Sequence, residues 1–223
     1  MMTTMIRGGL AAAALLIAPL AAQAADLNRG GYKAPIYSAP GYANWSGVYV
    51  GINGGYGFGR SNWDFPAVSP SPKGGLFGVT LGYNFQTGAW LWGAEGDIDY
   101  STIKGSTDCA PGATCETKNS WLATARARLG YAGFNNWLPY ITGGLAAGDV
   151  KASNSVLGSA NKTKIGYTVG AGVEYAIYSN WSVKGEYLYA DLGKFDCGIV
   201  CGATPDNVSF TTNLVRAGVN YRF

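Results

Sequence analysis

Eight segments of the chain alternate apolar and polar side chains with a period of two residues, and this alternation limits the fold more than any other feature. A period of two places one set of side chains on each face of an extended strand, so the pattern predicts β-strands rather than helices. After residue 24, no apolar run is long enough to form a membrane-spanning helix. The eight predicted strands are 46–59, 74–85, 90–103, 119–131, 137–150, 163–176, 181–192 and 209–223.

The connections between these strands alternate in length and are marked by aromatic residues. The connections 86–89, 132–136 and 177–180 are short, whereas the other four are long, polar and rich in Gly, Ser or Pro. Each short connection follows a strand that ends in Tyr and precedes a strand that begins with Trp, and this unit of two strands repeats every 44–48 residues. The aromatic residues of the repeat are Trp45, Trp90, Trp137, Trp181, Tyr83, Tyr131, Tyr175 and Tyr221.

A repeat of this length also occurs in β-propellers, but a propeller blade contains four strands and this unit contains two. A ring of Trp and Tyr at one end of the strands is typical of a membrane–water interface, and short turns opposite long loops are typical of outer-membrane barrels. The sequence therefore predicts an all-β fold, namely an eight-stranded antiparallel transmembrane β-barrel with short periplasmic turns and four longer surface loops. In this interpretation, the eight aromatic residues of the repeat lie at the membrane interface.

The polar face of the predicted strands carries charged residues, and this decides which face points outward. An Arg or Lys side chain that faced lipid at the bilayer midplane would cost about 2–4 kcal/mol, so the charged face is predicted to line the interior. The predicted interior charges are Glu95, Asp97, Asp99, Arg126, Arg128, Glu174, Lys184, Glu186, Arg216 and Arg222. Placing opposite charges side by side predicts two strand registers. The predicted opposite pairs are Glu95 with Arg128, Asp97 with Arg126, Glu186 with Arg216, and Trp181 with Tyr221.

The first 24 residues have the layout of a secretory signal peptide. Arg7 supplies a positive charge, an apolar run extends over 10–20, and Ala22-Gln23-Ala24 precedes the predicted cleavage point. The apolar run is shorter than the roughly 18–20 residues that a spanning helix needs, which disfavours a retained membrane anchor. We expect a signal peptide at 1–24, a periplasmic linker at 25–44 and the barrel at 45–223. The formal charge of +3, without a Lys/Arg cluster in the sequence, predicts no nucleic-acid partner.

Four cysteines lie in two of the long polar connections: Cys109, Cys115, Cys197 and Cys201. An even number of cysteines in an exported protein predicts disulfide bonds, most simply Cys109–Cys115 and Cys197–Cys201, although four cysteines allow three pairings. The cysteine spacings differ from those of zinc sites, and the chain has no histidine. No metal site is therefore predicted.

Four stretches that follow the signal peptide resemble the sequences of a known protein family. They are Lys33-Ala34-Pro35, Trp45–Gly51, Trp92–Asp97 and Leu138–Gly144. These stretches are similar to small outer-membrane β-barrel proteins and surface antigens of alphaproteobacteria, which are related to the OmpA-type transmembrane barrel. The resemblance implies a location in the outer membrane of a Gram-negative bacterium, with periplasmic termini. It also implies that Tyr221 and Phe223 form the C-terminal signal that the outer-membrane assembly machinery recognises.

The interior of an eight-stranded barrel is just wide enough for side chains to fill it. The sequence therefore predicts a structural, surface-exposed protein in contact with outer-membrane lipid, serving membrane integrity, surface contact or adhesion through loops that meet host or surface ligands. Two alternatives are a low-conductance porin-like channel and ligand binding by loop residues such as Trp63, Phe65 and Phe195. Without histidine, the usual general base is missing, so we expect neither an enzyme nor a bound cofactor.

Overall fold

A computed structural model describes residues 43–63, 69–156, 158–196 and 207–223. The predicted signal peptide at 1–24 and all but the last two residues of the predicted linker at 25–44 lie outside the described residues, as do Phe65, Cys197 and Cys201. Within the described part of the chain, no helix is long and apolar enough to cross a membrane.

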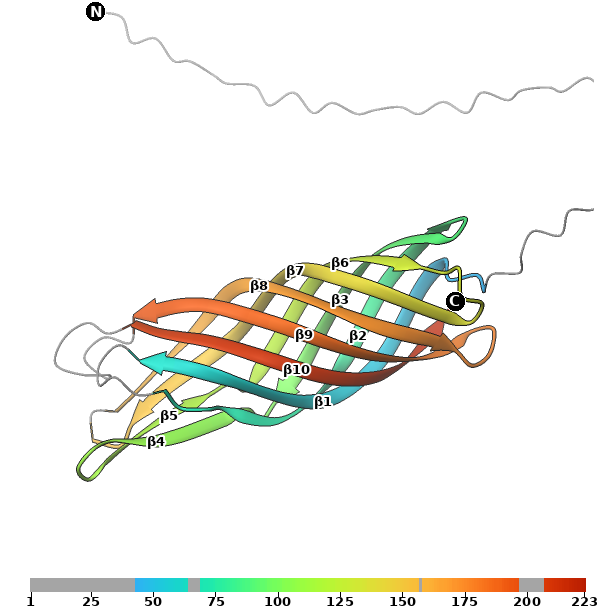
Figure 1. Ribbon diagram of the computed structural model, residues 1–223. Helices are drawn as coiled ribbons and strands as arrows, with labels where there is room; N and C mark the ends of the chain where they lie inside the picture. Colours follow the sequence, from blue (N-terminus) through green and yellow to red (C-terminus); the bar gives the residue numbers. More distant parts are fainter. Residues whose placement is uncertain (1–42, 64–68, 157, 197–206) are drawn as a thin grey trace, which may run out of the picture. The chain divides into compact units, whose positions relative to one another are not determined.

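The described residues form an antiparallel sheet that closes on itself (Figure 1). The strands are β1 Gly47–Trp63, β2 Lys73–Thr87, β3 Trp90–Ser101, β4 Lys104–Ala110, β5 Ala113–Lys118, β6 Trp121–Tyr131, β7 Trp137–Asn154, β8 Gly158–Ala176, β9 Trp181–Asp196 and β10 Asn207–Arg222. Eight of them form a ring in the order β1-β2-β3-β6-β7-β8-β9-β10, and β10 pairs with β1 to close it. The prediction of an eight-stranded antiparallel barrel is confirmed.

The strand register fixes the tilt and the width of the barrel. A path drawn perpendicular to the strands from Val50 returns to β1 at Arg60, ten residues further along. The residues on the path are Val50, Leu81, Gly96, Ala125, Leu145, Tyr167, Asp191, Thr211 and Arg60. With about 3.3 Å per residue and about 4.8 Å between strands, a shear of ten over eight strands gives a tilt of about 40° and a radius of about 8 Å. Such a barrel is filled by its own side chains.

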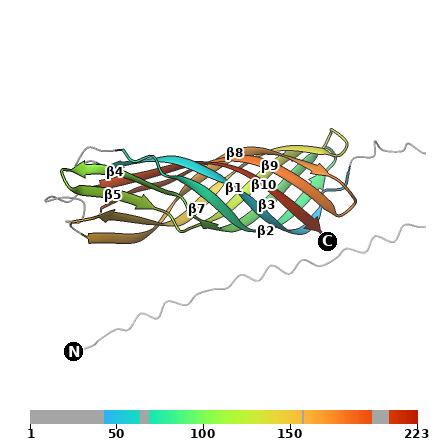
Figure 2. The same ribbon diagram turned by 90° about the horizontal axis from the view of Figure 1, so that it is seen from below.

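The strands are longer at one end than the sequence predicts. The segment 104–118, predicted as part of a loop, forms the hairpin β4–β5, whose strands pair with β2 and β7. The predicted loop 151–162 is also mostly strand, because β7 and β8 remain paired to Asn154 and Gly158. These extensions lack clear apolar alternation because most of their side chains are solvated. Figure 2 shows β4 and β5 at the end opposite to the C-terminus, and we name these the loop end and the turn end.

One of the two predicted registers is confirmed and the other is wrong by two residues. Glu186 lies opposite Arg216, and Trp181 lies opposite Tyr221, as predicted. Across β3 and β6, however, Glu95 lies opposite Arg126 rather than Arg128, and Asp97 lies opposite Thr124. A slip of two keeps every side chain on its predicted face, so alternation alone could not detect the error.

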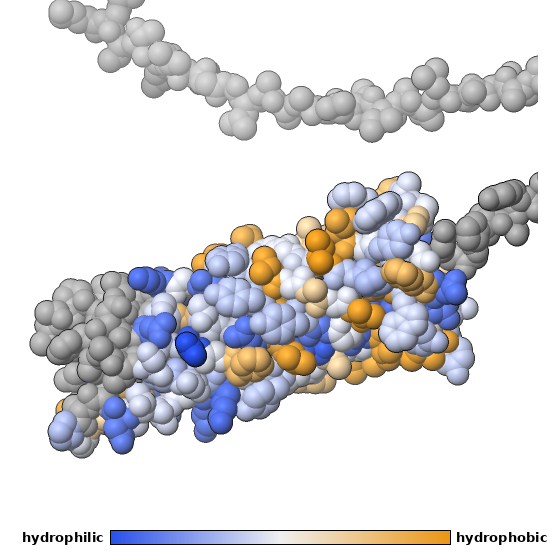
Figure 3. All heavy atoms as spheres, in the orientation of Figure 1, coloured by the Kyte–Doolittle hydropathy of each residue, from blue (hydrophilic) through white to orange (hydrophobic). Residues whose placement is uncertain are grey.

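The outward face of the barrel is an apolar belt between two rings of aromatic residues. At the turn end, Trp90 is 53% exposed, and its ring packs 5.3 Å from that of Tyr131. Tyr100 stands on the same face of β3, ten residues nearer the loop end. At about 3.3 Å per residue and a tilt of about 40°, the two aromatic belts that these residues mark are about 25 Å apart along the membrane normal, close to the height of the apolar band of known barrels. In Figure 3, hydrophobic residues gather over the middle and the turn end.

Two of the predicted placements are corrected by the structure. Trp45 was expected at the membrane interface, but it is only 1% exposed and packs inside the turn end against Leu91 and Leu138. It precedes β1, where the chain crosses the barrel mouth instead of running along the wall. Arg222 was expected in the interior, but it is half-buried at the same mouth, with its guanidinium 5.4 Å from the Trp45 ring, because it is the last residue of β10.

Candidate functional site

The centre of the barrel holds a network of charged side chains from five strands. Its carboxylates are Glu95, Asp97, Asp99, Glu174 and Glu186, and its cations are Arg126, Arg128, Lys184 and Arg216. The structure thus brings together nine of the ten side chains that the sequence assigned to the interior, all of them buried. Alternation places them there because each has the same parity as the inward residues of its strand.

Two arginines tie opposite walls of the barrel together. Arg126 on β6 contacts Glu95 at 2.5 Å and Asp97 at 2.6 Å, both on β3, and reaches Glu186 on β9 at 3.1 Å. Arg216 on β10 crosses the lumen in the other direction. It contacts Asp97 at 2.8 Å and Asp99 at 2.6 Å on β3, and Glu186 at 2.6 Å on β9. Each guanidinium therefore meets three carboxylates, which offsets the cost of burying its charge.

The remaining cations complete the network toward the turn end. Arg128 pairs with Glu174 on β8, and its guanidinium stacks 3.6 Å from the centre of the Tyr140 ring. The Lys184 ammonium lies 2.9 Å from Glu95. The Tyr49 hydroxyl donates a hydrogen bond of 2.7 Å to the same carboxylate. Hydroxyl and amide groups from Thr124, Ser182 and Asn220 donate to the carboxylates as well.

Apolar side chains close the interior on both sides of the charged network. At the turn end, the cluster consists of Trp45, Leu91, Ala132, Leu138 and Ala176. At the loop end, a larger cluster includes Leu122, Leu188, Phe210 and Leu214. These residues follow the charges along the same inward face, as Leu188 follows Glu186 and Leu214 precedes Arg216. The interior is therefore a stack of three layers: apolar, charged and apolar.

Sequence reasoning missed three features whose signal was present. Tyr49 and Tyr140 belong to the charged network, and each shares the inward parity of its strand. The apolar layers were missed because apolar residues were assigned to the lipid face alone. The aromatic ring at the loop end was also missed, although its residues continue the outward alternation. Its members include Tyr56, Phe58, Phe77, Tyr100, Tyr167, Tyr187 and Tyr189.

The loop residues singled out from the sequence are only partly described. Cys115 is buried in β5 and is disulfide-bonded. The side chains of Cys109, Cys197 and Cys201 lie outside the described residues, as do those of Trp63, Phe65 and Phe195, so the cysteine pairing and the loop ligand site stay predictions. Among the described residues, no group of three or more Cys, Asp or Glu side chains is arranged to hold a metal ion.

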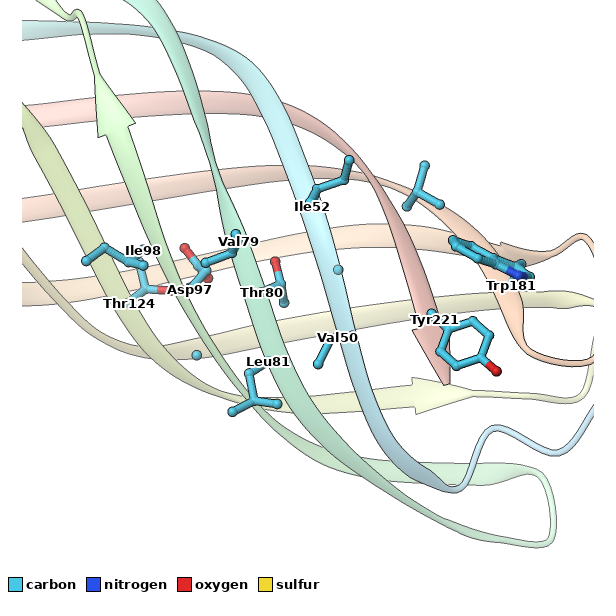
Figure 4. A pocket seen from close by; sticks show the side chains of 13 residues that line it. Val50, Ile52, Val79, Thr80, Leu81, Asp97, Ile98, Thr124, Trp181 and Tyr221 are labelled. Atoms are coloured by element: carbon cyan, nitrogen blue, oxygen red, sulfur yellow. Dashed lines mark hydrogen bonds between the residues drawn. The ribbon is translucent and has the colours of Figure 1, made fainter. Parts of the chain in front are cut away.

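A hollow opens on the outer wall of the barrel. It is lined by outward apolar side chains such as Val50, Ile52 and Leu81, with Trp181 and Tyr221 at its turn end, and also by Thr80, Asp97 and Thr124 (Figure 4). Because the hollow lies within the apolar belt, hydrocarbon chains of the membrane are its natural contents.

Comparison with known sequences links the chain to proteins of one cellular location. The family model described as "Outer membrane protein beta-barrel domain" matches residues 10–223. The 31 kDa outer-membrane immunogenic protein of Brucella melitensis is 37% identical over 226 aligned residues, which cover 91% of this chain and 93% of that protein. The 22 kDa outer membrane protein of Rhizobium leguminosarum bv. viciae is 35% identical, over 86% of this chain and 82% of that protein.

Comparison with solved structures supports the same architecture. Neisserial surface protein A aligns with a TM-score of 0.50 and 19% sequence identity, over 80% of this chain and 98% of that one. At this level of identity, the similarity concerns the fold alone.

Proposed function

Because this chain belongs to the outer membrane protein beta-barrel domain family, we propose that it is a structural, surface-exposed barrel of the Gram-negative outer membrane. In this role, the wall and its filled interior contribute to membrane integrity, and the loop end provides surface contact or adhesion. The two relatives named above are called outer-membrane proteins, and one of them is called immunogenic. Neither name specifies a reaction, and no enzymatic step enters the proposal.

The observation that carries the proposal is the three-layer interior. Every cation of the network contacts at least one carboxylate, and the apolar layers lie above and below these charges. A continuous water path would have to pass Trp45 at the turn end and Phe210 at the loop end, both only 1% exposed. A barrel of about 8 Å radius leaves little room around such side chains. The structure therefore favours a scaffold over a channel.

Ion conductance in a planar lipid bilayer tests this proposal. Folding is first verified by resistance to SDS without heating, and the parent protein is then expected to give no discrete current steps. The double variant W45A/F210A removes the largest side chain from each apolar layer, so steps in this variant would show that the assay detects a water path. Reproducible steps from the parent, altered by Arg126→Gln, would instead establish the low-conductance channel.

We further propose that Cys109 and Cys115 pair within the β4–β5 hairpin and stiffen the exposed loop end. Thr107 lies opposite Cys115, Asp108 lies opposite Thr114, and Ala110 lies opposite Ala113, with a register shift between Asp108 and Ala110. Cys109 therefore belongs to this irregularity of the hairpin, two residues along β4 from the position opposite Cys115. Peptide mapping without reduction should recover one linked peptide that contains residues 109 and 115. Recovery of Cys115 linked to Cys197 or Cys201 would contradict this pairing.

A further inference from the structure

Four lysines that are scattered in the sequence form a continuous row on the outer wall at the loop end. Lys73 on β2 lies opposite Lys104 on β4, Lys104 lies opposite Lys118 on β5, and Lys118 lies opposite Lys151 on β7. Residues that lie directly opposite in an antiparallel sheet point to the same face, with Cβ atoms about 4.5–5.5 Å apart. All four side chains are exposed. We name residues Lys73, Lys104, Lys118 and Lys151 the lysine row.

Acidic residues close to the lysine row do not neutralise it. None of the four ammonium groups forms an ion pair with a described residue. Asp149 stands two residues from Lys151, but its carboxylate accepts hydrogen bonds from the backbone N–H groups of Ser120 and Trp121, at 2.7 and 3.0 Å. Glu116, two residues from Lys118, and Asp108, four residues from Lys104, are the other described acidic residues on this face. The Asp108 carboxylate accepts a hydrogen bond of 3.4 Å from the Thr114 hydroxyl. The patch therefore keeps an excess of positive charge.

The lysine row begins at the edge of the apolar belt and rises away from it. Lys73 lies opposite the exposed Phe58 of the loop-end aromatic ring. Because the strands tilt by about 40°, each step from one strand to the next raises the row by about 3 Å, so it spans about 9 Å of height. This height is comparable to the roughly 5–8 Å interfacial region that lies beyond the hydrocarbon core on each side of a bilayer. The ammonium groups thus stand at the level of lipid headgroups.

Like charges directly opposite one another destabilise a sheet unless a counter-charge lies between them. We propose that the lysine row binds anionic, phosphate-bearing headgroups of lipid in the outer leaflet of the membrane. An ammonium on a long stem is a point-like phosphate ligand that can follow headgroups of varied geometry. The position of the row beside Phe58, at the edge of the apolar belt, favours a lipid over a soluble polyanion. A membrane lipid necessarily holds its phosphate at the level of the headgroups, whereas a soluble polyanion does not. Such binding does not depend on whether the barrel conducts ions.

Binding of a fluorescent bis-phosphorylated lipid A tests the proposal, with the full-length protein refolded in nonionic dodecyl maltoside micelles and fluorescence anisotropy as the readout. One variant, K104Q/K118Q, removes the two central lysines of the row. The matched control, K162Q/K194Q, removes two exposed lysines at the same end but outside the row. A lysine near an anionic surface contributes roughly a fivefold gain in affinity, so K104Q/K118Q should bind about 20- to 30-fold more weakly and the control within about twofold.

A second measurement separates lost binding from lost folding. In micelles without lipid A, K104Q/K118Q should unfold at the same or a higher urea concentration than the parent, because two opposed charges are gone. In the presence of lipid A, only the parent and the control should gain further resistance. Equal affinities of all three proteins for lipid A, or equal losses in both variants, would overturn the proposal. Row-dependent binding of soluble heparin without binding of lipid A would overturn it in favour of a polysaccharide partner.

Discussion

Arg126 illustrates how single residues determine the interior of this barrel. Its guanidinium contacts Glu95 and Asp97 on one wall and Glu186 on another. A lone buried guanidinium would be very costly, and so would the carboxylates if the cation were missing. The Arg126 side chain therefore neutralises these carboxylates and links β3 to β9 by ion pairs.

Replacing this guanidinium by an apolar side chain of similar length should destabilise the barrel strongly. Arg126→Met leaves three carboxylates that share fewer cations, and we expect a loss of about 3–5 kcal/mol in the free energy of unfolding. Urea unfolding in phospholipid vesicles, followed by tryptophan fluorescence, measures this loss. Lys162→Met removes a positive charge at an exposed position and should change the same free energy by less than about 0.5 kcal/mol. Equal unfolding midpoints for the two variants would show that the network contributes little.

At the scale of the strand, the close approach of neighbouring strands explains where glycine is required. A Cβ added at Gly144 on β7 would collide with backbone atoms of Ala125 and Arg126 on β6. A Cβ added at Gly185 on β9 would meet nothing within 4 Å. The difference follows from the faces, because Gly144 points into the crowded interior beside Arg126, whereas Gly185 stands on the outward face between Val183 and Tyr187.

Two alanine substitutions test this reading of the strands. Gly144→Ala forces backbone atoms of β6 and β7 apart and should destabilise the barrel by about 1–3 kcal/mol or more. Gly185→Ala adds the same methyl group to open space and should change the free energy of unfolding by less than about 0.5 kcal/mol. The urea assay in vesicles compares the two directly. If Gly144→Ala unfolds at the same urea concentration as Gly185→Ala, β6 and β7 are not packed as tightly at Gly144 as the structure indicates.

At the scale of the whole molecule, the two ends of the barrel differ in build. The turn end closes with tight connections and the C-terminus, whereas the loop end carries the β4–β5 hairpin and the extended strands β7 and β8 (Figures 1 and 2). Outer-membrane barrels place short turns in the periplasm and long loops outside the cell. This orientation determines which leaflet the lysine row meets.

Cysteine labelling on cells tests the orientation with two positions of similar exposure. Val156 at the loop end is 70% exposed, and Tyr178 at the turn end is 74% exposed. A membrane-impermeant maleimide should label Val156→Cys in intact cells, but Tyr178→Cys only after the outer membrane is permeabilised. The unmodified protein gives the background from the native cysteines. Labelling of Tyr178→Cys in intact cells, with Val156→Cys protected, would reverse the orientation.

Alternation, aromatic repeats and loop lengths predicted the eight strands of the barrel ring, its closure and the inward face of nine of the ten charged residues assigned to the interior. These features depend on local geometry, since a period of two and a turn length are properties of neighbouring residues along the chain. The register between β9 and β10 could be predicted because opposite charges and an aromatic pair agree on one alignment. Between β3 and β6, two alignments both pair opposite charges on the inward face, so the sequence did not distinguish them.

Only the tertiary structure decided which side chains meet across the lumen and along the rim. Arg126 reaches Glu186, and Arg216 reaches Asp97, because the barrel is narrow enough for long side chains to cross it. Trp45 turns inward because the chain enters across the mouth, which no periodic pattern indicates. The lysine row could not be predicted either, because Lys73 and Lys151 are far apart in sequence and are aligned only by the pairing of the β4–β5 hairpin with β2 and β7. Local patterns fix the wall of a barrel, whereas its shear and width fix the contacts between distant residues.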